Sequence, residues 1–319
     1  MYVEEPVVDP NENRINLLLS AVNIAEKLKP EQLNRIGAEI CEGFEIDKAS
    51  RAGWERKYDD ALKLASQIVE HKNFPWQGAA NIKYPQLTTA CIQFSARAYP
   101  ALIPGRELVL TRVTGFDEAG RKAQRAKRIS MHMSYQLLEE MEEWEEEMDR
   151  MLVMLPCTGT EFKKTRFCPL RKRNVSEHVQ AKDLVVNYWA KSLAQASRVT
   201  HVLTLSPNEL RERVLLGIYL DHKLKTPSGW PETMRAVSDR LQGLSAPNVD
   251  QDTPFEILEC HTWIDIDDDE YKEPYIVTVD RETRKVLRIT ARFDKEGVTQ
   301  EGKGRILRIE DNKVVVKET

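Results

Sequence analysis

The sequence has no run of about 18 apolar residues, and this absence excludes a helix that spans a membrane. Its N-terminus has neither a basic segment nor an apolar core, so we expect no signal peptide. Five cysteines are too few for a disulfide scaffold, and none forms a Cys-x-x-Cys pair, which is typical of small buried side chains in a reducing compartment. With 14 glycines and 15 prolines, collagen-like and low-complexity chains are also excluded.

The chain also lacks the basic excess of a free-standing nucleic-acid-binding protein, since its net charge is −4. Any DNA contact is therefore expected to be local, or transient and weak. Charged residues nevertheless make up 31% of the chain, against about 25% in an average soluble protein. Because apolar residues recur periodically through most of the chain, this excess indicates a strongly hydrated surface and not disorder.

The first half of the chain has the apolar spacing of helices. The longest periodic stretch, residues 121–155, is predicted to be one helix about 50 Å long. Its first turns are basic and its middle is acidic, against the helix dipole at the start, so we expect tertiary or intersubunit contacts to hold it. The other elements predicted here are helices over about 11–30, 31–43, 48–71 and 86–99 and a strand over 107–113.

After Pro156 the pattern changes to short strands separated by polar turns. The predicted fold class is therefore α+β, with a mainly helical region at residues 1–155 and a β-rich, antiparallel region at residues 156–319. Short helices are expected at residues 208–220 and 232–241. Strands are expected over 159–167, 174–179, 184–186, 198–205, 255–264, 275–280, 285–293, 304–310 and 313–317.

An aromatic, turn-forming segment at residues 74–80 separates two predicted helices. Its residues are apolar, small or aromatic, so we predict a tightly packed loop in which Trp76 is largely buried. Truncating a buried aromatic of this size typically costs about 3–5 kcal/mol.

Motifs that would carry chemistry are incomplete. Residues 297–304 match the spacing G-x-x-x-x-G-K of a phosphate-binding loop, but Gly304 stands where a magnesium-binding hydroxyl belongs and a strand follows. The acidic run 265–270 begins like a calcium loop, yet Glu270 replaces the required glycine; an irregular cation site and a solvated turn both stay open. The six histidines lack zinc spacing. No catalytic, cofactor-binding or metal-binding residue is predicted, and no cofactor is expected.

Two charged segments are candidates for an interface: the acidic middle of the long helix and a basic strand–turn–strand. Three interpretations of the basic segment stay open, namely contact with phosphate, pairing with the acidic helix of the same or a neighbouring subunit, and simple solvation. Surface ion pairs are weak singly, but a set repeated around a ring would fix orientation. The candidate interface residues are Glu142, Glu143, Glu146, Glu147, Lys163, Lys164, Lys172 and Arg173.

Two extended stretches carry a resemblance to a known family. The first consists of NFPWQGAANIKYP at residues 73–85 and FSARAYPALIPG at residues 94–105. The second consists of GTEFKK at 159–164, NVSEHV at 174–179, DLVVNY at 183–188 and RVTHV at 198–202. With the hairpin at 280–289, they resemble the N-terminal part of portal proteins of short-tailed bacteriophages. The resemblance runs from about residue 13 to the end and rests on extended similarity, without a catalytic signature.

The resemblance implies a non-enzymatic, structural role in the virion. Portal proteins form a homo-oligomeric ring, usually of twelve subunits, at one capsid vertex, and are assembled in the host bacterial cytoplasm. The terminase docks on the ring and drives double-stranded DNA through its channel, and tail or adaptor proteins attach afterwards. The region resembled here is the wing, which contacts the major capsid protein and neighbouring subunits. Because stem, clip and crown lie further along the family's chain, this sequence is expected to stop before them.

Two other interpretations of the sequence stay open. A DNA-binding or nucleotide-using enzyme would use residues 297–304 and 163–173 and would bind nucleotide. An unrelated α+β scaffold or adaptor would recruit a partner through its long helix and would be a monomer or dimer that forms no rings.

Overall fold

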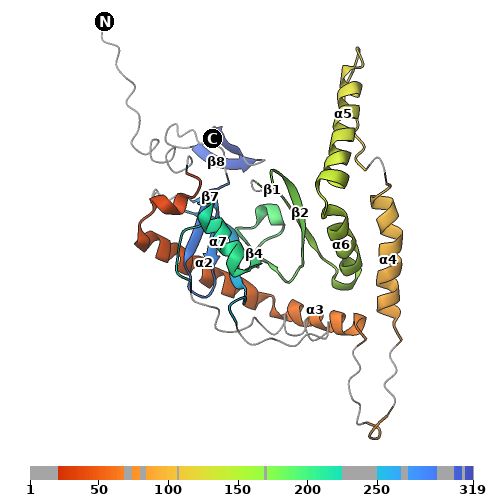
Figure 1. Ribbon diagram of the computed structural model, residues 1–319, viewed down its shortest axis with the longest axis horizontal. Coiled ribbons are helices and arrows are strands. Elements are labelled where there is room, and N and C mark those ends of the chain that lie inside the picture. Colours follow the sequence, from red (N-terminus) through yellow and green to blue (C-terminus); the bar gives the residue numbers. More distant parts are fainter. Residues whose placement is uncertain are drawn as a thin grey trace. The chain divides into compact units, whose positions relative to one another are not determined.

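A computed structural model describes residues 21–67, 74–79, 84–105, 108–168, 171–224, 250–266 and 272–292, and the backbone of strands at 305–310 and 313–318. The chain forms two compact units, each assembled from segments distant in sequence (Figure 1). Unit 1 comprises Met1–Ala52, Asp183–Pro231 and Pro247–Thr319, and unit 2 comprises Gly53–Lys182 and Glu232–Ala246.

The predicted α+β class is confirmed, since helices dominate the first part of the chain and antiparallel sheets follow. The described helices of unit 1 are η1 (Ile24–Lys27), α2 (Pro30–Ser50), η3 (Leu193–Gln195) and α7 (Pro207–Leu215). Its strands are β3 (Leu184–Val186), β4 (Arg198–Leu205), β5 (Phe255–Ile264), β6 (Glu273–Asp280), β7 (Val286–Ala291), β8 (Arg305–Glu310) and β9 (Lys313–Glu318). Unit 2 contains α3 (Ala52–Ala65), α4 (Gln86–Leu102), α5 (Arg121–Tyr135), the π-helical turn η2 (Gln136–Glu140), α6 (Trp144–Thr158), β1 (Phe162–Cys168) and β2 (Arg173–Val179).

Unit 1 is built on a five-stranded antiparallel sheet in the order β3-β4-β5-β6-β7, and β8 and β9 form a separate hairpin. The strands predicted after Pro156 are all present to within a few residues at either end. Alternation along β5 sends Leu258 and Ile257 into different core clusters, so both faces of the sheet are covered. Helix α2 packs on the first face through Ile36 and Phe44, and Leu205 and Tyr219 lie on the second.

The β7 edge of the sheet is bonded by the side chain of Asn23, which is 0% exposed, and by the backbone nitrogen of Leu220, which donates to the Leu287 carbonyl at 2.9 Å. Its amide nitrogen donates to the carbonyl oxygens of Leu287 (2.9 Å) and Ile218 (3.2 Å). Its amide oxygen accepts from the backbone nitrogens of Ile289 (3.0 Å) and Ala25 (3.1 Å). Asn23 thus satisfies groups of β7 that a further strand would otherwise bond, and protects the edge from pairing with another chain.

Helix α2 approaches its neighbours closely at two glycines. A Cβ atom at Gly37 would lie 2.1 Å from the carbonyl oxygen of Arg284, and one at Gly43 would lie 2.3 Å from the guanidinium of Arg198. That guanidinium donates through Nε to the buried Asp47 carboxylate at 2.6 Å, and the Asn187 amide donates to the same carboxylate at 3.0 Å. The glycines therefore let α2 lie against the β6–β7 turn and let Arg198 reach a carboxylate that burial would otherwise leave unpaired.

The cysteines have the surroundings that their low number predicted. All five are reduced thiols; four are buried and Cys157 is half-buried. Burial raises the pKa of the Cys260 thiol to about 12 and that of Cys41 to about 11, so both stay protonated at neutral pH. His201, predicted to be a packed histidine in a strand, is indeed a buried residue of β4.

The single helix predicted over residues 121–155 is wrong, because the structure divides it. Helix α5 passes into the π-turn η2, where the Met141 nitrogen donates to the Gln136 carbonyl at 2.9 Å, and α6 begins at Trp144. Leaving the helix at Met141 lets both Met141 and Trp144 pack with Ile103 in one buried cluster. Helix α6 then continues to Thr158 with Pro156 inside it.

The strand predicted over residues 107–113 is also wrong for its described part, 108–113, which is irregular. Side chains of α5 bond this segment instead of a neighbouring strand. The Ser134 hydroxyl accepts from the Val109 nitrogen at 3.1 Å, Ser130 donates to the Val109 carbonyl, and Thr111 donates to the Ala126 carbonyl at 2.7 Å. The β-branched composition favoured a strand, but strand formation depends on a neighbouring strand that this segment lacks.

The prediction that Trp76 is buried is also wrong, since its side chain is 67% exposed. Phe74 and Tyr84 are also exposed, and Trp76 belongs to no core cluster among the described residues. The turn at residues 74–79 is closed locally by a hydrogen bond from Ala79 N to Trp76 O at 3.1 Å. The aromatic residues of this segment therefore belong to an exposed turn and not to a packed loop.

Several predicted features lie outside the described residues. They are residues 11–20 of the helix predicted over 11–30, the helix over 232–241, the phosphate-loop match at 297–304 and most of the acidic run 265–270. Before α2 begins at Pro30, residues 21–29 contain only the 3-10 turn η1, so the α-helix predicted there is wrong in its described half. The helix predicted over 208–220 is confirmed in its first part and ends as α7 at Leu215, before Gly217, whose φ of 68° does not continue a helix.

The close approach at Gly37 gives a stability prediction. We expect Gly37→Ala to lower the free energy of unfolding by about 1–3 kcal/mol, because the new Cβ meets a backbone carbonyl that cannot rotate away. Gly53→Ala is the matched control, since no atom lies within 4 Å of its Cβ position in α3. It should leave stability equal or slightly higher. Urea denaturation of both variants makes the comparison, and equal stability would contradict the close packing of α2.

The edge closure by Asn23 gives a second prediction. Asn23→Ala should destabilise the protein by about 1–3 kcal/mol, because it leaves the buried Ile289 nitrogen of β7 without its acceptor. Asn208→Ala, on the exposed first turn of α7, should change stability by no more than about 0.5 kcal/mol. Hydrogen exchange should show β7 amides losing protection first in Asn23→Ala. Unchanged exchange there would contradict the assignment of edge closure to this side chain.

Candidate assembly surface

Helix α6 and the β1–β2 hairpin carry both charged segments that the sequence singled out, and both belong to unit 2. Glu145, Glu146 and Glu147 occupy the first turn of α6, where the helix dipole favours negative charge. The helix ends at Gly159, whose φ of 80° suits the left-handed position after a C-terminus. The acidic run therefore lies at the start of a helix, where its charge is favourable. The prediction of one helix over residues 121–155 had placed it in the middle.

The hairpin β1–β2 pairs in antiparallel register from Phe162 opposite Val179 to Cys168 opposite Arg173. Its alternation buries Val175 and Val179. Lys164 lies opposite Glu177 in the register, and Arg166 donates to that same Glu177 at 2.8 Å. Part of the basic charge is therefore neutralised inside the hairpin.

The hairpin is clamped to the start of α6 by Glu143. Arg173 donates to both oxygens of its carboxylate, at 3.1 and 3.0 Å, and Arg171 donates to one of them. Arg173 also donates to the Glu140 carbonyl oxygen. Slight burial opposes ionisation of Glu143, but hydrogen bonds and the two guanidinium groups outweigh it and hold the pKa of the carboxyl below its usual value.

A second contact joins Lys163 to Trp144. The ammonium nitrogen lies 4.8 Å from the centroid of the indole and donates to the Trp144 carbonyl oxygen at 3.3 Å. Burial lowers the pKa of Lys163, and the nearby Glu147 carboxylate opposes this shift. A cation held over an aromatic face in this way stabilises the packing of β1 on α6.

A buried pair that no sequence motif indicates joins the residue before β1 to strand β2. His178 Nε2 and Glu161 Oε2 are 2.8 Å apart, with side chains 5% and 0% exposed. The Thr158 hydroxyl donates to the other Glu161 oxygen at 2.8 Å, and the His178 backbone nitrogen donates to Glu147 at 2.7 Å. These bonds fix the chain between α6 and β1 and leave the pair enclosed, so we assign it a structural role.

Helices α4 and α6 enclose an open groove of about 540 Å³. One wall is acidic and the other is formed by α4, where the Tyr99 hydroxyl donates to Glu145. That hydrogen bond raises the pKa of Tyr99. The lining residues are Ser95, Ala96, Tyr99, Pro100, Glu142, Glu145, Glu146 and Asp149. We call this feature the acidic groove.

The structure separates the predicted interface residues into three groups. The first group joins the hairpin to the start of α6 within one chain: Arg173 bonds to Glu143, Lys163 bonds to the Trp144 carbonyl, and the His178 nitrogen bonds to Glu147. This is the pairing within one subunit that the sequence left open. Glu142 and Glu146 instead line the exposed acidic groove. Lys164 is half-buried on β1, and Lys172 is exposed in the hairpin turn. An interface between copies involving these residues stays a prediction.

Among the described residues, no three His, Cys, Asp or Glu side chains gather closely enough to hold a metal ion. None of the described helices combines the length and hydropathy needed to cross a membrane. In comparisons with known proteins, no family model and no curated protein matches the chain.

The Glu143 clamp predicts a pH-dependent contribution to stability. Because the folded pKa is lowered, the stabilisation is present above the ordinary value of 4.5 and is lost as the pH falls through the folded value. We expect Glu143→Gln to be less stable than wild type at pH 7, with the difference shrinking toward about pH 3.

The control for this experiment is Glu139→Gln, which removes an exposed carboxylate from η2. Urea denaturation at several pH values should show a difference from wild type that varies less with pH. A Glu143→Gln deficit that is constant from pH 7 to about pH 3 would contradict the ionic character of the clamp.

Proposed function

We propose that the chain is the wing-bearing part of a bacteriophage portal subunit, a non-enzymatic component of a ring at the capsid vertex. The ring serves as the conduit for genome packaging and ejection and as the docking site for terminase and tail. In this role the protein resides in the virion and contacts neighbouring subunits, the major capsid protein and, non-specifically, double-stranded DNA.

The resemblance that suggests this function falls on well-formed elements. The sequence at 94–105 belongs largely to α4, the sequences at 159–164 and 174–179 to the β1–β2 hairpin, and that at 198–202 to β4. The helical and antiparallel architecture agrees with the wing that the family resemblance implies. This agreement supports the proposal at the level of architecture.

The observation that carries the proposal is the exposed apolar surface of unit 2. Large apolar side chains are exposed on α4 and on α5. Exposed large apolar side chains are typical of protein–protein contacts where they gather on one surface. The side chains are Ile92, Phe94, Leu102, Ile129, Met131, Met133 and Tyr135. A ring subunit needs two such surfaces, one for each neighbour.

The test is the assembly state of the complete gene product. We expect electron microscopy of the purified protein to show rings with a central hole, and native mass spectrometry to give a single subunit number. A protein that stays monomeric or dimeric over the concentration range of assembly would contradict the portal function and favour the scaffold or adaptor interpretation. Micromolar binding of Mg-ATP, lost on Lys303→Ala, would favour the nucleotide-using alternative.

A further inference from the structure

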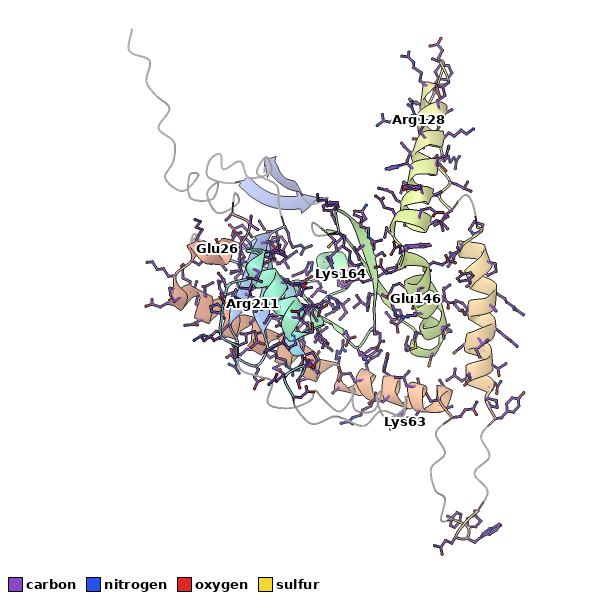
Figure 2. The ribbon with its side chains drawn as sticks, viewed as in Figure 1. Glu26, Lys63, Arg128, Glu146, Lys164 and Arg211 are labelled. Atoms are coloured by element: carbon purple, nitrogen blue, oxygen red, sulfur yellow. The ribbon has the colours of Figure 1, made fainter. Side chains whose placement is uncertain are left out.

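The solvent-facing side of α5 carries a row of basic side chains. Arg121, Arg125, Arg128 and His132 follow one another at intervals of 4, 3 and 4 residues, which places all four on one helix face. All four are exposed, and Figure 2 shows Arg128 on this helix. We call these residues the basic ridge.

The opposite face of α5 explains why the ridge points away from its own chain. On that face the hydroxyls of Ser130 and Ser134 bond to the backbone of Val109. The Ala126 carbonyl accepts from Thr111. Small side chains on that face allow the segment to lie close to the helix. The orientation of α5 about its axis is therefore fixed, with the ridge outward.

The ridge is electrostatically unfavourable in the isolated chain. Helix α5 carries five arginines and lysines and no acidic residue. Like charges four residues apart, such as Arg121 and Arg125, destabilise a helix, and basic residues in a first turn oppose the helix dipole. Within the helix this is offset locally by Asp117, which accepts from the Ala123 nitrogen at 2.9 Å. An anionic partner along the ridge would remove the remaining cost.

The acidic groove carries carboxylates at the same sequence spacing. Glu142, Glu146 and Asp149 follow one another at intervals of 4 and 3 residues, as Arg121, Arg125 and Arg128 do. The arginine row extends about 10 Å along α5. Glu146 and Asp149 lie on α6, and Glu142, in the turn before α6, lines the same groove.

Two of the groove carboxylates, Glu142 and Asp149, form no ion pair with any residue that the structure describes. Glu146 has only the exposed Arg150, at 2.5 Å. Glu145 is already held by Tyr99, which favours the row at 142, 146 and 149 for an external partner.

The two rows cannot meet within one chain. Helix α5 leads through η2 into α6, and Figure 1 shows the two helices following one another end to end. The ridge therefore lies beyond the start of α6 and not alongside it.

We propose that the basic ridge of one copy docks along the acidic groove of a second copy, with Arg121, Arg125 and Arg128 facing Glu142, Glu146 and Asp149. The occupant of the groove is thus α5 of a neighbouring subunit. The two surfaces differ, so the contact is heterologous, and repetition gives a ring or an open chain. This inference deepens the proposed function and rests on it for closure into a ring.

Apolar side chains beside both rows favour a protein over a nucleic acid as the partner. Met131 and Tyr135 are exposed and flank the ridge on α5. On α4, the exposed Ile92 lies one turn before Ala96 on the face that lines the groove. Apolar contacts rimmed by charge are typical of protein interfaces, whereas nucleic-acid interfaces are more polar and more positive.

Three variants test the contact in the 319-residue chain. The ridge variant carries Arg121→Glu, Arg125→Glu and Arg128→Glu, and the groove variant carries Glu142→Arg, Glu146→Arg and Asp149→Arg. The control variant has the same charge change as the ridge variant at exposed sites elsewhere, Lys27→Glu, Arg56→Glu and Lys57→Glu. Circular dichroism and thermal unfolding establish that each is folded.

Self-association is measured by sedimentation velocity and native mass spectrometry. We expect the ridge and groove variants each to associate at least about tenfold more weakly than wild type, because three facing pairs become repulsive, and the control to associate normally. An equimolar mixture of the two should associate again, because every contact in an alternating assembly then joins opposite charges. Higher salt should weaken wild-type association.

Other outcomes would overturn the inference. They are a monomeric wild-type chain, undiminished association of the ridge variant, or a mixture that stays dissociated although both variants are folded. Binding of a 30-base-pair DNA duplex that is lost in the ridge variant, with association unchanged, would assign the ridge to nucleic acid. If a variant does not fold, wild-type association that is insensitive to salt contradicts the contact.

The inference and the proposed function can fail separately. Rings that persist in the ridge variant would refute the contact and leave the portal function standing. Association that depends on ridge and groove but yields only open chains of the complete gene product would refute the ring and leave the contact standing.

Discussion

Unit 1 depends on the hydrogen bonds of one buried amide, because its described part is assembled from three pieces of chain that are far apart in sequence. Asn23, in the first piece, bonds to Ile218 in the second and to Leu287 and Ile289 in the third. An asparagine side chain can supply donors and an acceptor at the same point, which an apolar residue cannot. With the sheet edge closed in this way, α2 can cover one face while the β6–β7 turn passes Gly37 at close range. A sheet edge left open would instead invite pairing with other chains, which a subunit of a defined assembly has to avoid.

In unit 2, only some of the charged side chains have partners of opposite charge within the described part of the chain. Glu143 forms ion pairs with Arg171 and Arg173. The Lys163 ammonium lies over the Trp144 indole, near the Glu147 carboxylate. These contacts fix the hairpin on α6 and leave it with little charge to offer. The remaining charge is separated, with α5 wholly basic and the groove side of α6 acidic. A chain that neutralises one pair of charged segments internally and leaves another pair apart has charge to use in contacts with other copies.

The sequence was most informative where side-chain periodicity decides the structure. Strands β3, β4 and β5 were located to the residue, because alternation and β-branched content reflect burial directly. The predictions were wrong where the structure of a segment depends on the element it packs against. Residues 108–113 form no strand and bond to α5 hydroxyls, and Trp76 lies on an exposed turn. The helical repeat also did not indicate the π-turn η2 that brings Met141 and Trp144 into one cluster. The site shows the same division: its charged segments were visible, but the pairing of Glu143 with Arg173 depends on the break between α5 and α6. The arginine spacing on α5 was readable in the sequence and gains meaning only once the opposite face is seen to be covered.

The break at Met141 also decides what the charges can do between copies. In one uninterrupted helix, the basic and acidic rows would turn through whatever angle the helical repeat imposed over twenty-one residues. The π-turn and the residues after it reset that angle, so the face that α6 presents beside α4 is set by packing of Met141 and Trp144 and not by the phase of α5. A head-to-tail contact requires such control, because the rotation from one subunit to the next follows from the angle between its two surfaces. Ion pairs of about 1 kcal/mol or less each cannot impose that angle, but they can select it when the core beneath them is rigid. The buried cluster around Met141 is therefore the element through which the fold of one chain would set the geometry of an assembly.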